Sequence, residues 1–207
     1  MIVHPPLPLG YSQVPPGHLA TMVTCLEMTL PPAIRPGAGL APPWSLLALD
    51  RHDLDGYREL FRKVGTDWLW DSRLVMADET LAAILANPDV LSFALCHGTE
   101  RLGMLELDFR EAGQCELTYF GLAGAAIGQG LGRALMDEAL AMAWARPISR
   151  FWVHTCSFDH PSAVGFYIRS GFRPYATMVE LMTDPRLEGR LPPDAAPQIP
   201  LIQPPSP

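Results

Sequence analysis

The sequence has few features of a membrane or exported protein. Its apolar runs fall short of the roughly 18–20 residues that a helix needs to span a bilayer. The first residues, MIVHPPLPLG, lack both the basic segment and the continuous apolar segment of a signal peptide. We therefore expect a cytoplasmic protein with no membrane partner.

Cysteine is also scarce. The chain has four cysteines, Cys25, Cys96, Cys115 and Cys156, and no two of them form a CxxC pair. Each lies in an apolar stretch with the pattern of a strand, which is typical of buried, reduced thiols in an intracellular protein. The cysteines therefore indicate neither a disulfide framework nor a thiol-based metal site.

Positive charge is in short supply as well. Lys and Arg number 15 against 22 Asp and Glu, so the formal net charge is −7. A nucleic-acid-binding protein needs clustered Lys and Arg to meet the phosphate backbone. The charge balance argues against a nucleic-acid partner and favours a cationic one, such as an amine.

What the chain does contain suits one globular domain. It has 207 residues, of which 48% are hydrophobic and 18% charged. This length allows one substantial core. Its 22 prolines concentrate near the ends, and proline resists both helix and sheet pairing. We predict a Pro-rich N-terminal arm at residues 1–17, a domain at 18–183 and a Pro-rich C-terminal tail at 184–207, with both ends extended or mobile.

Apolar periodicity and turn residues predict the elements of the domain. A loop at Pro31–Pro43 interrupts them. One helix is expected to start at Asp53 or Asp55 and end at Gly65, and another to start at Asp78 or Thr80 and end at Asn87-Pro88. The other predicted elements are strands His18–Met28, Val90–His97, Arg101–Arg110, Gln114–Leu122, Ser149–Thr155 and Arg173–Met182, and helices Gly130–Ala145 and Pro161–Ser170.

The order of these elements predicts the fold class. Short breaks between the strands of residues 90–122 favour antiparallel hairpins. The strand–helix–strand succession that follows implies one parallel pairing across the helix. We therefore predict an α/β protein with a mixed sheet, antiparallel in its front strands, with one βαβ crossover near the end.

The most informative stretch is Ile127-Gly128-Gln129-Gly130-Leu131-Gly132-Arg133-Ala134-Leu135, directly before an amphipathic helix. Glycines let a backbone turn tightly and approach a ligand closely. The free N–H groups of the first helical turn and the helix dipole together favour an anion, such as a diphosphate. The glycines alone are equally compatible with a turn that only packs a helix against a strand.

Two other phosphate-binding motifs do not fit this stretch. The dinucleotide fingerprint GxGxxG needs a third glycine where Arg133 stands, and an acidic residue about 20 residues later. The strand Ser149–Thr155 contains no acidic residue. A P-loop needs Gly-Lys-Ser/Thr, and the motif contains no lysine.

The motif resembles the signature of the GNAT N-acetyltransferase superfamily, Arg/Gln-x-x-Gly-x-Gly/Ala, at the start of the acetyl-CoA-binding helix. Gly130 and Gly132 match its two small positions, and Ile127 departs from the Arg/Gln position. Two further segments are similar to the family in register. The segment Glu116–Leu122 resembles its central strand, and its pattern Asn-x-x-Ala-x-x-x-Tyr-x-x-x-Gly-Phe is matched by Ala163, Tyr167, Gly171 and Phe172, with His160 in place of the asparagine.

The resemblance implies a GNAT-like fold with a V-shaped cleft between the central strands, opened by a bulge for which Gly121 is a plausible place. It also implies acetyl-CoA as co-substrate and no metal. Backbone amides near the end of the central strand would polarise the thioester, and those of the glycine loop would hold the diphosphate. The implied binding residues are Gly121, Leu122, Ala123, Gly128, Gln129, Gly130, Leu131, Gly132, Arg133 and Ala134.

For catalysis, the resemblance implies a glutamate base at Glu116 and a tyrosine acid at Tyr167. An amine must lose a proton to attack, and alkylamines have pKa values near about 10, so a nearby base helps. The leaving thiolate needs a proton in return. The ordinary alternatives are a solvent-facing strand-end glutamate and a tyrosine packed in the core.

Other residues are weaker candidates. His154, Cys156 and His160 do not match the spacing of any usual zinc site, although His154 is a candidate for a second proton-handling role. Trp68, Trp70 and Arg73 lie in the region that usually shapes the acceptor pocket in this superfamily, so they are candidates for substrate contact as well as for ordinary packing.

Three functions remain open. The first is an N-acetyltransferase that transfers acetyl from acetyl-CoA to a primary amine by direct attack in a ternary complex, with a small-molecule or peptide amine as acceptor. The second is a non-catalytic acetyl-CoA-binding sensor or regulatory module. The third is a scaffold domain whose Pro-rich arms recruit partners. A homodimer is compatible with each.

Overall fold

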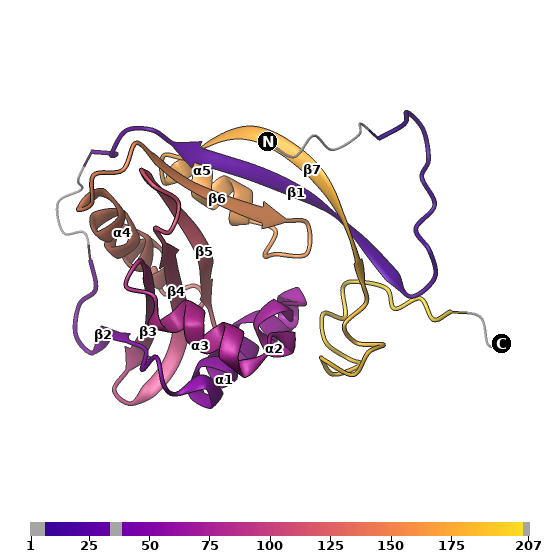
Figure 1. The fold of residues 1–207 in the computed structure, drawn as a ribbon, viewed down its shortest axis with the longest axis horizontal. Coiled ribbons are helices and arrows are strands. Elements are labelled where there is room, and N and C mark those ends of the chain that lie inside the picture. Colours follow the sequence, from indigo (N-terminus) through magenta and orange to yellow (C-terminus); the bar gives the residue numbers. More distant parts are fainter. Residues whose placement is uncertain (1–6, 34–38, 205–207) are drawn as a thin grey trace.

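The computed structural model describes residues 7–33 and 39–204. Within them it has seven strands and five α-helices (Figure 1). In chain order these are β1 (His18–Met28), β2 (Trp44–Ala48), α1 (Leu54–Gly65), α2 (Ser72–Val75), α3 (Asp78–Ala86), β3 (Val90–His97), β4 (Glu100–Asp108), β5 (Gln114–Leu122), α4 (Leu131–Trp144), β6 (Arg150–Cys156), α5 (Ala163–Arg169) and β7 (Arg173–Thr183), with short 3₁₀ helices at Thr66–Trp68 and Gly124–Ala126.

Most predicted elements are confirmed, and their ends have local causes. Asp53 caps α1, its carboxylate accepting the amide of Gly56 at 2.9 Å. The strand predicted to reach Arg110 ends at Asp108, because the Asp108 carboxylate accepts the Arg110 amide at 2.9 Å and turns the chain. The strand β2 and the one-turn helix α2 were not predicted. Part of the predicted loop Pro31–Pro43, residues 34–38, lies outside the described residues.

The strands form one mixed sheet in the order β2-β3-β4-β5-β6-β1-β7. Every neighbouring pair is antiparallel except β5 and β6, which run parallel on either side of the α4 crossover. The predicted mixed α/β class, with antiparallel front strands and one βαβ crossover, is therefore confirmed.

The parallel pair separates soon after it begins. The register of β5 and β6 holds only at Gln114↔Arg150, Cys115↔Phe151 and Glu116↔Trp152. Beyond Glu116 the two strands diverge, so that β6, β1 and β7 form a second part of the sheet, separated from β2–β5 by the opening (Figure 1). This divergence is the V-shaped opening that was predicted between the central strands.

A bulge in β5 lies at Thr118, not at the expected Gly121. The β4–β5 register passes from Leu107↔Leu117 directly to Glu106↔Tyr119, which leaves Thr118 as the extra residue. The extra residue reverses the alternation of side chains, so Leu117 and then Phe120 face the α4 side, whereas Tyr119 faces the α1 side. Gly121 instead permits close packing, since a Cβ there would lie 2.5 Å from Val64 Cγ1.

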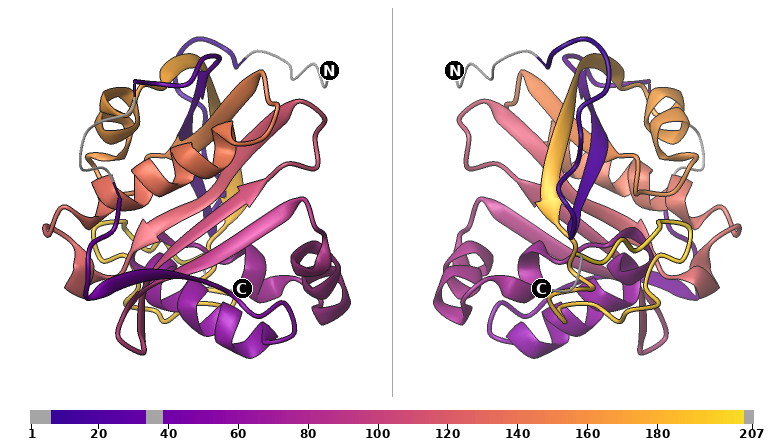
Figure 2. Two further views of the ribbon diagram at one scale, coloured as in Figure 1. Left: turned by 90° about the vertical axis from the view of Figure 1, so that its left-hand side faces the viewer. Right: turned by 90° about the vertical axis from the view of Figure 1, so that its right-hand side faces the viewer.

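Two cores sandwich the central strands. Alternate residues of β4 serve each: Leu105 and Leu107 belong to the core under α4, and Met104 belongs to the core under α1 and α3. Figure 2 shows α4 and the purple helices as separate layers against the sheet. The β5–β6 opening therefore lies between the α4 side of the sheet and the side covered by α1 and α3.

The C-terminal segment does not extend away from the domain as predicted. Residues 184–202 follow β7 as irregular turns beside the region of α2 (Figures 1 and 2). Leu191, Ala195 and Ala196 are buried there in a third cluster with Leu19 and Leu69. Residues 7–16 are exposed and have no helix or strand, and residues 1–6 lie outside the described part, so the N-terminal arm stays a prediction.

Candidate active site

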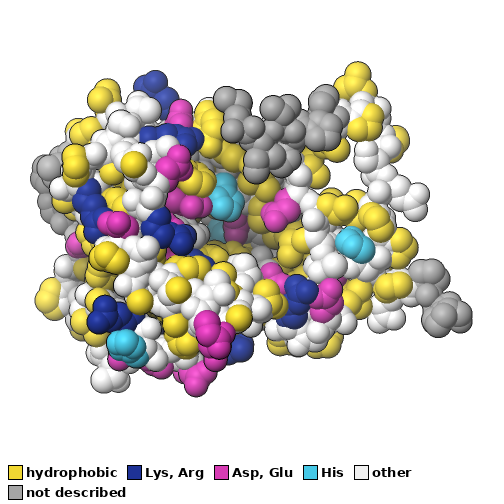
Figure 3. Space-filling model, in the orientation of Figure 1, with side chains coloured by type: hydrophobic (Ala, Val, Ile, Leu, Met, Phe, Trp, Pro, Cys, Tyr) yellow, Lys and Arg dark blue, Asp and Glu magenta, His cyan; other side chains and the backbone are white. Residues whose placement is uncertain are grey.

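A cavity of about 640 Å³ lies in the V-shaped opening. Its walls come from β5, the glycine loop, β6, α5, β7 and the segment between α1 and α2. In the face of the molecule seen in Figure 3, a hollow at the centre is bordered by a histidine and by acidic and hydrophobic side chains. The volume lies in the range of small-molecule sites.

The glycine loop forms one end of this cavity. Gly128 has φ +83° and Gly130 has φ +76°, a left-handed backbone that favours glycine. A Cβ at either position would meet no atom of the described residues within 4 Å, chain neighbours aside. The space in front of the loop is therefore open, as a ligand-binding cradle requires.

The loop also presents unused backbone donors. The amides of residues 128–132 have no acceptor within the described ranges 7–33 and 39–204. The amides of Arg133 and Ala134 are used inside the helix, at 3.0 and 3.3 Å from the Gly130 carbonyl oxygen. Arg133 and Ala134 were among the implied binding residues, but their backbone amides are therefore not available to a ligand. Five N–H groups at a helix start remain, which suits an anion.

The side chains of the loop have mixed roles. The side-chain amide of Gln129 donates to the Ala125 carbonyl at 2.8 Å, and Leu131 is buried in the α4 core. Ile127, at the Arg/Gln position of the signature, is 45% exposed and lines the cavity. Arg133 also lines it, with its Nε 3.5 Å from Asp137 Oδ1. A guanidinium at this mouth favours an anionic ligand.

At the end of β5 the backbone offers fewer donors than predicted. The Ala123 amide donates to the Leu102 carbonyl at 2.8 Å, so it is unavailable. Because amides alternate in direction along an antiparallel ladder, Gly121 directs its amide toward β4, and Leu122 directs its own toward the opening. By the same alternation the amide of Phe120, which was not a predicted binding residue, also points toward the opening. Gly121 and Leu122 both line the cavity.

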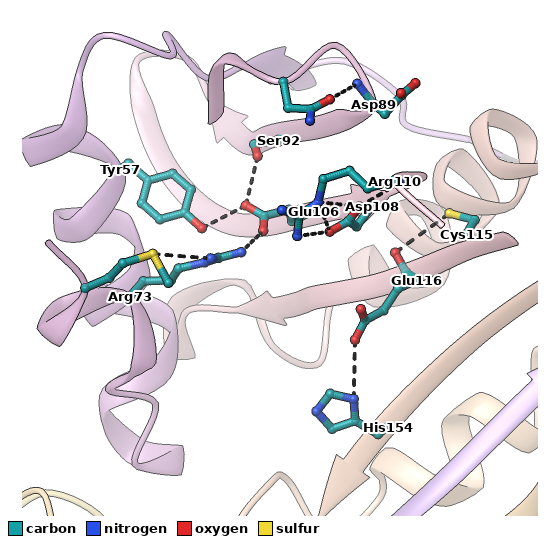
Figure 4. Close-up of polar contacts among 12 residues, drawn as sticks. Tyr57, Arg73, Asp89, Ser92, Glu106, Asp108, Arg110, Cys115, Glu116 and His154 are labelled. Carbon is teal, nitrogen blue, oxygen red and sulfur yellow. Dashed lines mark hydrogen bonds and ion pairs between the residues drawn. The ribbon is translucent and has the colours of Figure 1, made fainter. Parts of the chain in front are cut away.

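The predicted base contacts a histidine. Glu116 Oε1 lies 3.5 Å from His154 Nδ1, across the point where β5 and β6 part (Figure 4). The Glu116 side chain is 22% exposed and that of His154 is 50% exposed. Among the described residues that line the cavity, His154 is one and Glu116 is not. The carboxylate therefore stands behind the imidazole.

Acidic neighbours favour the protonated form of His154. The interaction with Glu116 raises the pKa of His154 above its ordinary value, partial burial opposes this, and the charges of Glu116, Asp159 and Glu180 raise the pKa further. The imidazole lies beside Trp152, with ring centroids 6.1 Å apart. The imidazole can accept one proton, and the carboxylate of Glu116 then offsets its positive charge.

Tyr167 reaches the cavity from α5. Its ring packs against Phe120, Phe166 and Phe172, and its exposed fraction is 7%. No described residue forms a hydrogen bond with its hydroxyl. Burial raises the pKa of Tyr167, and the charge of Asp159 raises it further. The phenol therefore keeps its proton and can donate a hydrogen bond.

The aromatic candidates before α2 divide into two groups. Trp68 and Trp70 line the cavity. The indole of Trp70 donates to Asp159 Oδ1 at 3.1 Å, and Trp68 lies edge-on to His160 at 5.5 Å. Arg73 is not part of the wall; it is buried and pairs with Glu106 at 2.6 Å. Its expected substrate contact is therefore not supported.

The buried cluster around Glu106 was missed by sequence reasoning. Its carboxylate, with no exposed area, accepts from Tyr57 at 2.7 Å, Arg73 at 2.6 Å and Ser92 at 2.8 Å (Figure 4). Arg73 in turn lies over the ring of Tyr119, at 5.1 Å from its centroid. The cluster thus supports a residue that lines the cavity.

We expect Glu106→Gln to lower the free energy of unfolding by about 2 kcal/mol, because it leaves the Arg73 guanidinium buried without its counter-charge. Urea denaturation measures this loss. Glu100→Gln, which removes a solvent-exposed pair with Lys63, is the matched control and should cost less than about 0.5 kcal/mol. Equal losses in the two variants would contradict the role of burial.

No group of three or more His, Cys, Asp or Glu side chains in the described part of the chain could hold a metal ion. Cys25, Cys96 and Cys115 are buried free thiols and Cys156 is half-buried. No helix among residues 7–33 and 39–204 is long and apolar enough to cross a bilayer.

Structural relatives share this architecture at low sequence identity. A functionally unknown conserved protein from Staphylococcus epidermidis superposes with a TM-score of 0.57 and 10% identity, covering 81% of this chain and 63% of its own. A GCN5-related N-acetyltransferase from Sphaerobacter thermophilus gives a TM-score of 0.55 and 12% identity, over 82% of this chain and 52% of its own. The present chain thus spans less than two thirds of either protein.

A third relative has a bound ligand. The aminoglycoside acetyltransferase meta-AAC0020, from an uncultured soil metagenomic sample and in complex with sisomicin, gives a TM-score of 0.51 and 14% identity over 62% of this chain and 87% of its own. Among curated proteins, none matches the chain in sequence.

The family itself follows from the sequence. A profile described as the acetyltransferase (GNAT) family matches residues 56–172, more than half of the chain. The match runs from α1 to the residue before β7 and so includes the glycine loop, β5 and α5. The chain therefore belongs to the GNAT acetyltransferase family, whose members use acetyl-CoA as co-substrate.

Proposed function

We propose that this protein is an N-acetyltransferase that transfers the acetyl group of acetyl-CoA to a primary amine by direct attack in one ternary complex. The observation that carries the proposal is a single cavity that extends from the glycine loop to His154. One end presents unused amides and Arg133, and the other presents the imidazole of His154, which Glu116 contacts from behind, and aromatic side chains. A donor and an acceptor can therefore meet in the V-shaped opening.

The glycine loop fits the diphosphate of acetyl-CoA. Its five unpaired amides and the α4 dipole favour a doubly charged group, and the positive φ of Gly128 and Gly130 keeps the approach free of side chains. Arg133 adds a positive charge at the same mouth. Acetyl-CoA supplies the thioester as the activated acyl group.

The open edge of β5 suits the thioester carbonyl. The amides of Phe120 and Leu122 face the gap that β6 leaves, and within the described part of the chain no strand pairs with them there. Fixed backbone donors at such a place stabilise the negative charge that develops on the carbonyl oxygen during attack. We assign this role to Leu122 first, since it lines the cavity next to the glycine loop.

Proton removal from the amine is assigned to the Glu116–His154 pair. In the tetrahedral intermediate the former amine nitrogen is positively charged and must lose a proton. His154 lines the cavity, while Glu116 lies 3.5 Å behind it and compensates the charge that the imidazole gains. The neutral imidazole is the acceptor, so the acidic neighbours make it a stronger base.

Tyr167 is assigned to the leaving sulfur. When the carbon–sulfur bond breaks, the sulfur takes the electron pair as a thiolate. The phenol hydroxyl has no competing partner among the described residues, and its raised pKa keeps it protonated as a hydrogen-bond donor. This donation stabilises the leaving group before the thiol is formed.

Tyr167→Phe is therefore expected to lower kcat by about tenfold with little change in the Kd of acetyl-CoA, since a hydrogen bond to a charged group contributes about 1.5–3 kcal/mol. Steady-state thiol release and calorimetry measure the two quantities. Tyr11→Phe, in the exposed N-terminal arm, serves as the control. An unchanged kcat would remove Tyr167 from the mechanism.

The acceptor is proposed to be a small-molecule or peptide amine. Glu116, Asp159 and Glu180 lie close enough to His154 to affect its pKa, and Asp159 and Glu180 line the cavity. This acidic end attracts a cationic group, and the net charge of −7 agrees with such a partner and argues against nucleic acid. One structural relative, similar at 14% identity, is an aminoglycoside acetyltransferase. A cytoplasmic location and a homodimer stay predictions.

The alternative is an acetyl-CoA-binding module without turnover. Ile127 stands exposed where the family signature has Arg or Gln, so the loop lacks one polar partner for the co-substrate. Both functions include acetyl-CoA binding. The test is thiol release from acetyl-CoA with a library of primary amines, followed by mass spectrometry of the product. Release with an acetylated amine supports the enzyme; tight binding without release supports the module.

A further inference from the structure

The C-terminal segment has three contacts with residues 67–71, the segment that carries part of the cavity wall, and neither the family resemblance nor the proposed reaction explains them. We call residues 184–199 the clasp. It begins where β7 ends and belongs to the part of the chain predicted to be a free tail. The family match ends at residue 172, so the clasp lies outside it.

The clasp is held in shape by a buried arginine. Arg186 is 5% exposed, and its guanidinium donates to Asp184 at 2.7 and 3.0 Å. The same group donates to the carbonyl oxygens of Ala195 at 3.1 Å and Ile199 at 2.9 Å. One side chain thereby satisfies several backbone acceptors of a segment that has no helix or strand.

The clasp contacts residues 67–71, the segment that carries part of the cavity wall, at three places. The side-chain amide of Gln198 donates to the Asp67 carbonyl at 3.0 Å. Leu69 is 3% exposed and packs in one cluster with Leu191, Ala195 and Ala196. The guanidinium of Arg190 lies 2.8 Å from the Asp71 carboxylate. The contacts span the chain from residue 67 to residue 71.

Residues 67–71, which the clasp contacts, carry aromatic side chains of the cavity wall at the acceptor end. Trp68 and Trp70, on either side of Leu69, line the cavity. Leu69 itself has φ +58°, a left-handed backbone that a residue with a side chain rarely adopts. Such a conformation persists only where its surroundings impose it. The turn at Leu69 is closed by two backbone hydrogen bonds, from Leu69 N–H to the Thr66 carbonyl at 3.3 Å and from Trp70 N–H to the Gly65 carbonyl at 3.0 Å. The Leu69 side chain belongs to a cluster with Leu19 and four clasp residues, Leu191, Ala195, Ala196 and Ile199, to which Leu74, Phe158 and Met182 also contribute.

We infer that the clasp is a positioning element of the acceptor site, which fixes Trp68 and Trp70 by holding Leu69 between them. This inference rests on the proposed function for its effect on catalysis, while its structural part stands alone. Among the described residues, no hydrogen bond, ion pair or core cluster joins the clasp to the glycine loop. Its loss is therefore expected to weaken acceptor binding and to spare acetyl-CoA binding.

The test is the double variant Arg190→Met/Gln198→Ala, which removes the two polar contacts and leaves the buried Arg186 network in place. Asp194→Ala, an exposed change on the same segment, is the control. Hydrogen exchange of the amides of residues 66–72 should quicken by about tenfold in the double variant and not in the control. The acceptor KM should rise by about fivefold while the Kd of acetyl-CoA stays within about twofold.

Three results would overturn the inference: unchanged exchange at residues 66–72, quickened exchange with an unchanged acceptor KM, or a parallel loss of acetyl-CoA affinity, which would indicate general destabilisation. If the wild-type protein acetylates no amine, the proposed function fails, and the exchange measurement still decides the clasp. Arg186→Met, which disrupts the clasp from inside, should reproduce the exchange result.

Discussion

Gly130→Asp is expected to weaken acetyl-CoA binding by about 1000-fold. The carboxylate would stand in the open space before the loop, where the account puts the diphosphate. Two like charges about 4 Å apart near a protein surface repel by about 4 kcal/mol, and about 1.4 kcal/mol is a tenfold change in affinity. Isothermal titration calorimetry with acetyl-CoA measures the effect.

Two control variants separate the effect of the added charge from that of backbone strain. Gly130→Ala adds a side chain at φ +76° without a charge, and should weaken binding by no more than about tenfold. Gly113→Asp adds the same charge at a similar φ of +74°, in the turn before β5 and outside the cavity wall, and should leave binding unchanged. A Gly130→Asp protein with wild-type affinity would refute the loop as the diphosphate site.

Glu116→Gln is expected to lower kcat/KM by about 100-fold near neutral pH, a usual loss when general-base catalysis is impaired. Glu116 raises the pKa of His154, so in the wild type the imidazole stays protonated to a higher pH and activity is lost as the pH falls through that raised pKa. Without the carboxylate, the pKa of His154 falls. In Glu116→Gln, the acid limb of the kcat/KM profile should therefore move to lower pH, and the maximum of kcat/KM should be lower than in the wild type.

The same pair can be tested for acting as one unit. If His154 accepts the proton and Glu116 supports it, the double variant Glu116→Gln/His154→Ala should be no slower than His154→Ala alone. The pKa of His154, followed by NMR titration of its ring protons in wild type and Glu116→Gln, gives a readout that needs no turnover. A pH profile with an unmoved acid limb would exclude the pair as the base.

Much of this site could be predicted because its signals are local. The positive-φ glycines before an amphipathic helix, the strand with Glu116 near its start and the Tyr167 pattern are each local features of the sequence. Their physical reasons, tight backbone approach and helix-start donors, do not depend on distant partners. The mixed sheet followed from the lengths of the breaks between strands in the same way.

What was missed depends on contacts between distant segments. Glu106 alternates with Leu105 and Leu107, a pattern that suggests a solvent-facing residue, yet its partners Tyr57 and Arg73 come from other elements and bury it. The position of the bulge depends on the β4–β5 register, which the glycine at 121 does not determine.

The clasp escaped prediction for a different reason. A proline-rich composition indicates that a segment forms neither helices nor β-sheet pairing. It does not indicate which residues the segment packs against. One signal was present: the spacing Asp184-x-Arg186 brings a carboxylate and a guanidinium together just after a strand. Its meaning depends on the carbonyl oxygens of Ala195 and Ile199, which the sequence does not reveal.

In the proposed enzyme, one cavity binds the diphosphate at the glycine loop and directs the thioester toward His154. A crystal structure of the protein with coenzyme A tests it most directly. We expect diphosphate oxygens within hydrogen-bond distance of the amides of residues 128–132, and the sulfur between the Leu122 amide and the Tyr167 hydroxyl. A coenzyme bound elsewhere, or one whose sulfur points away from β5, would contradict the account.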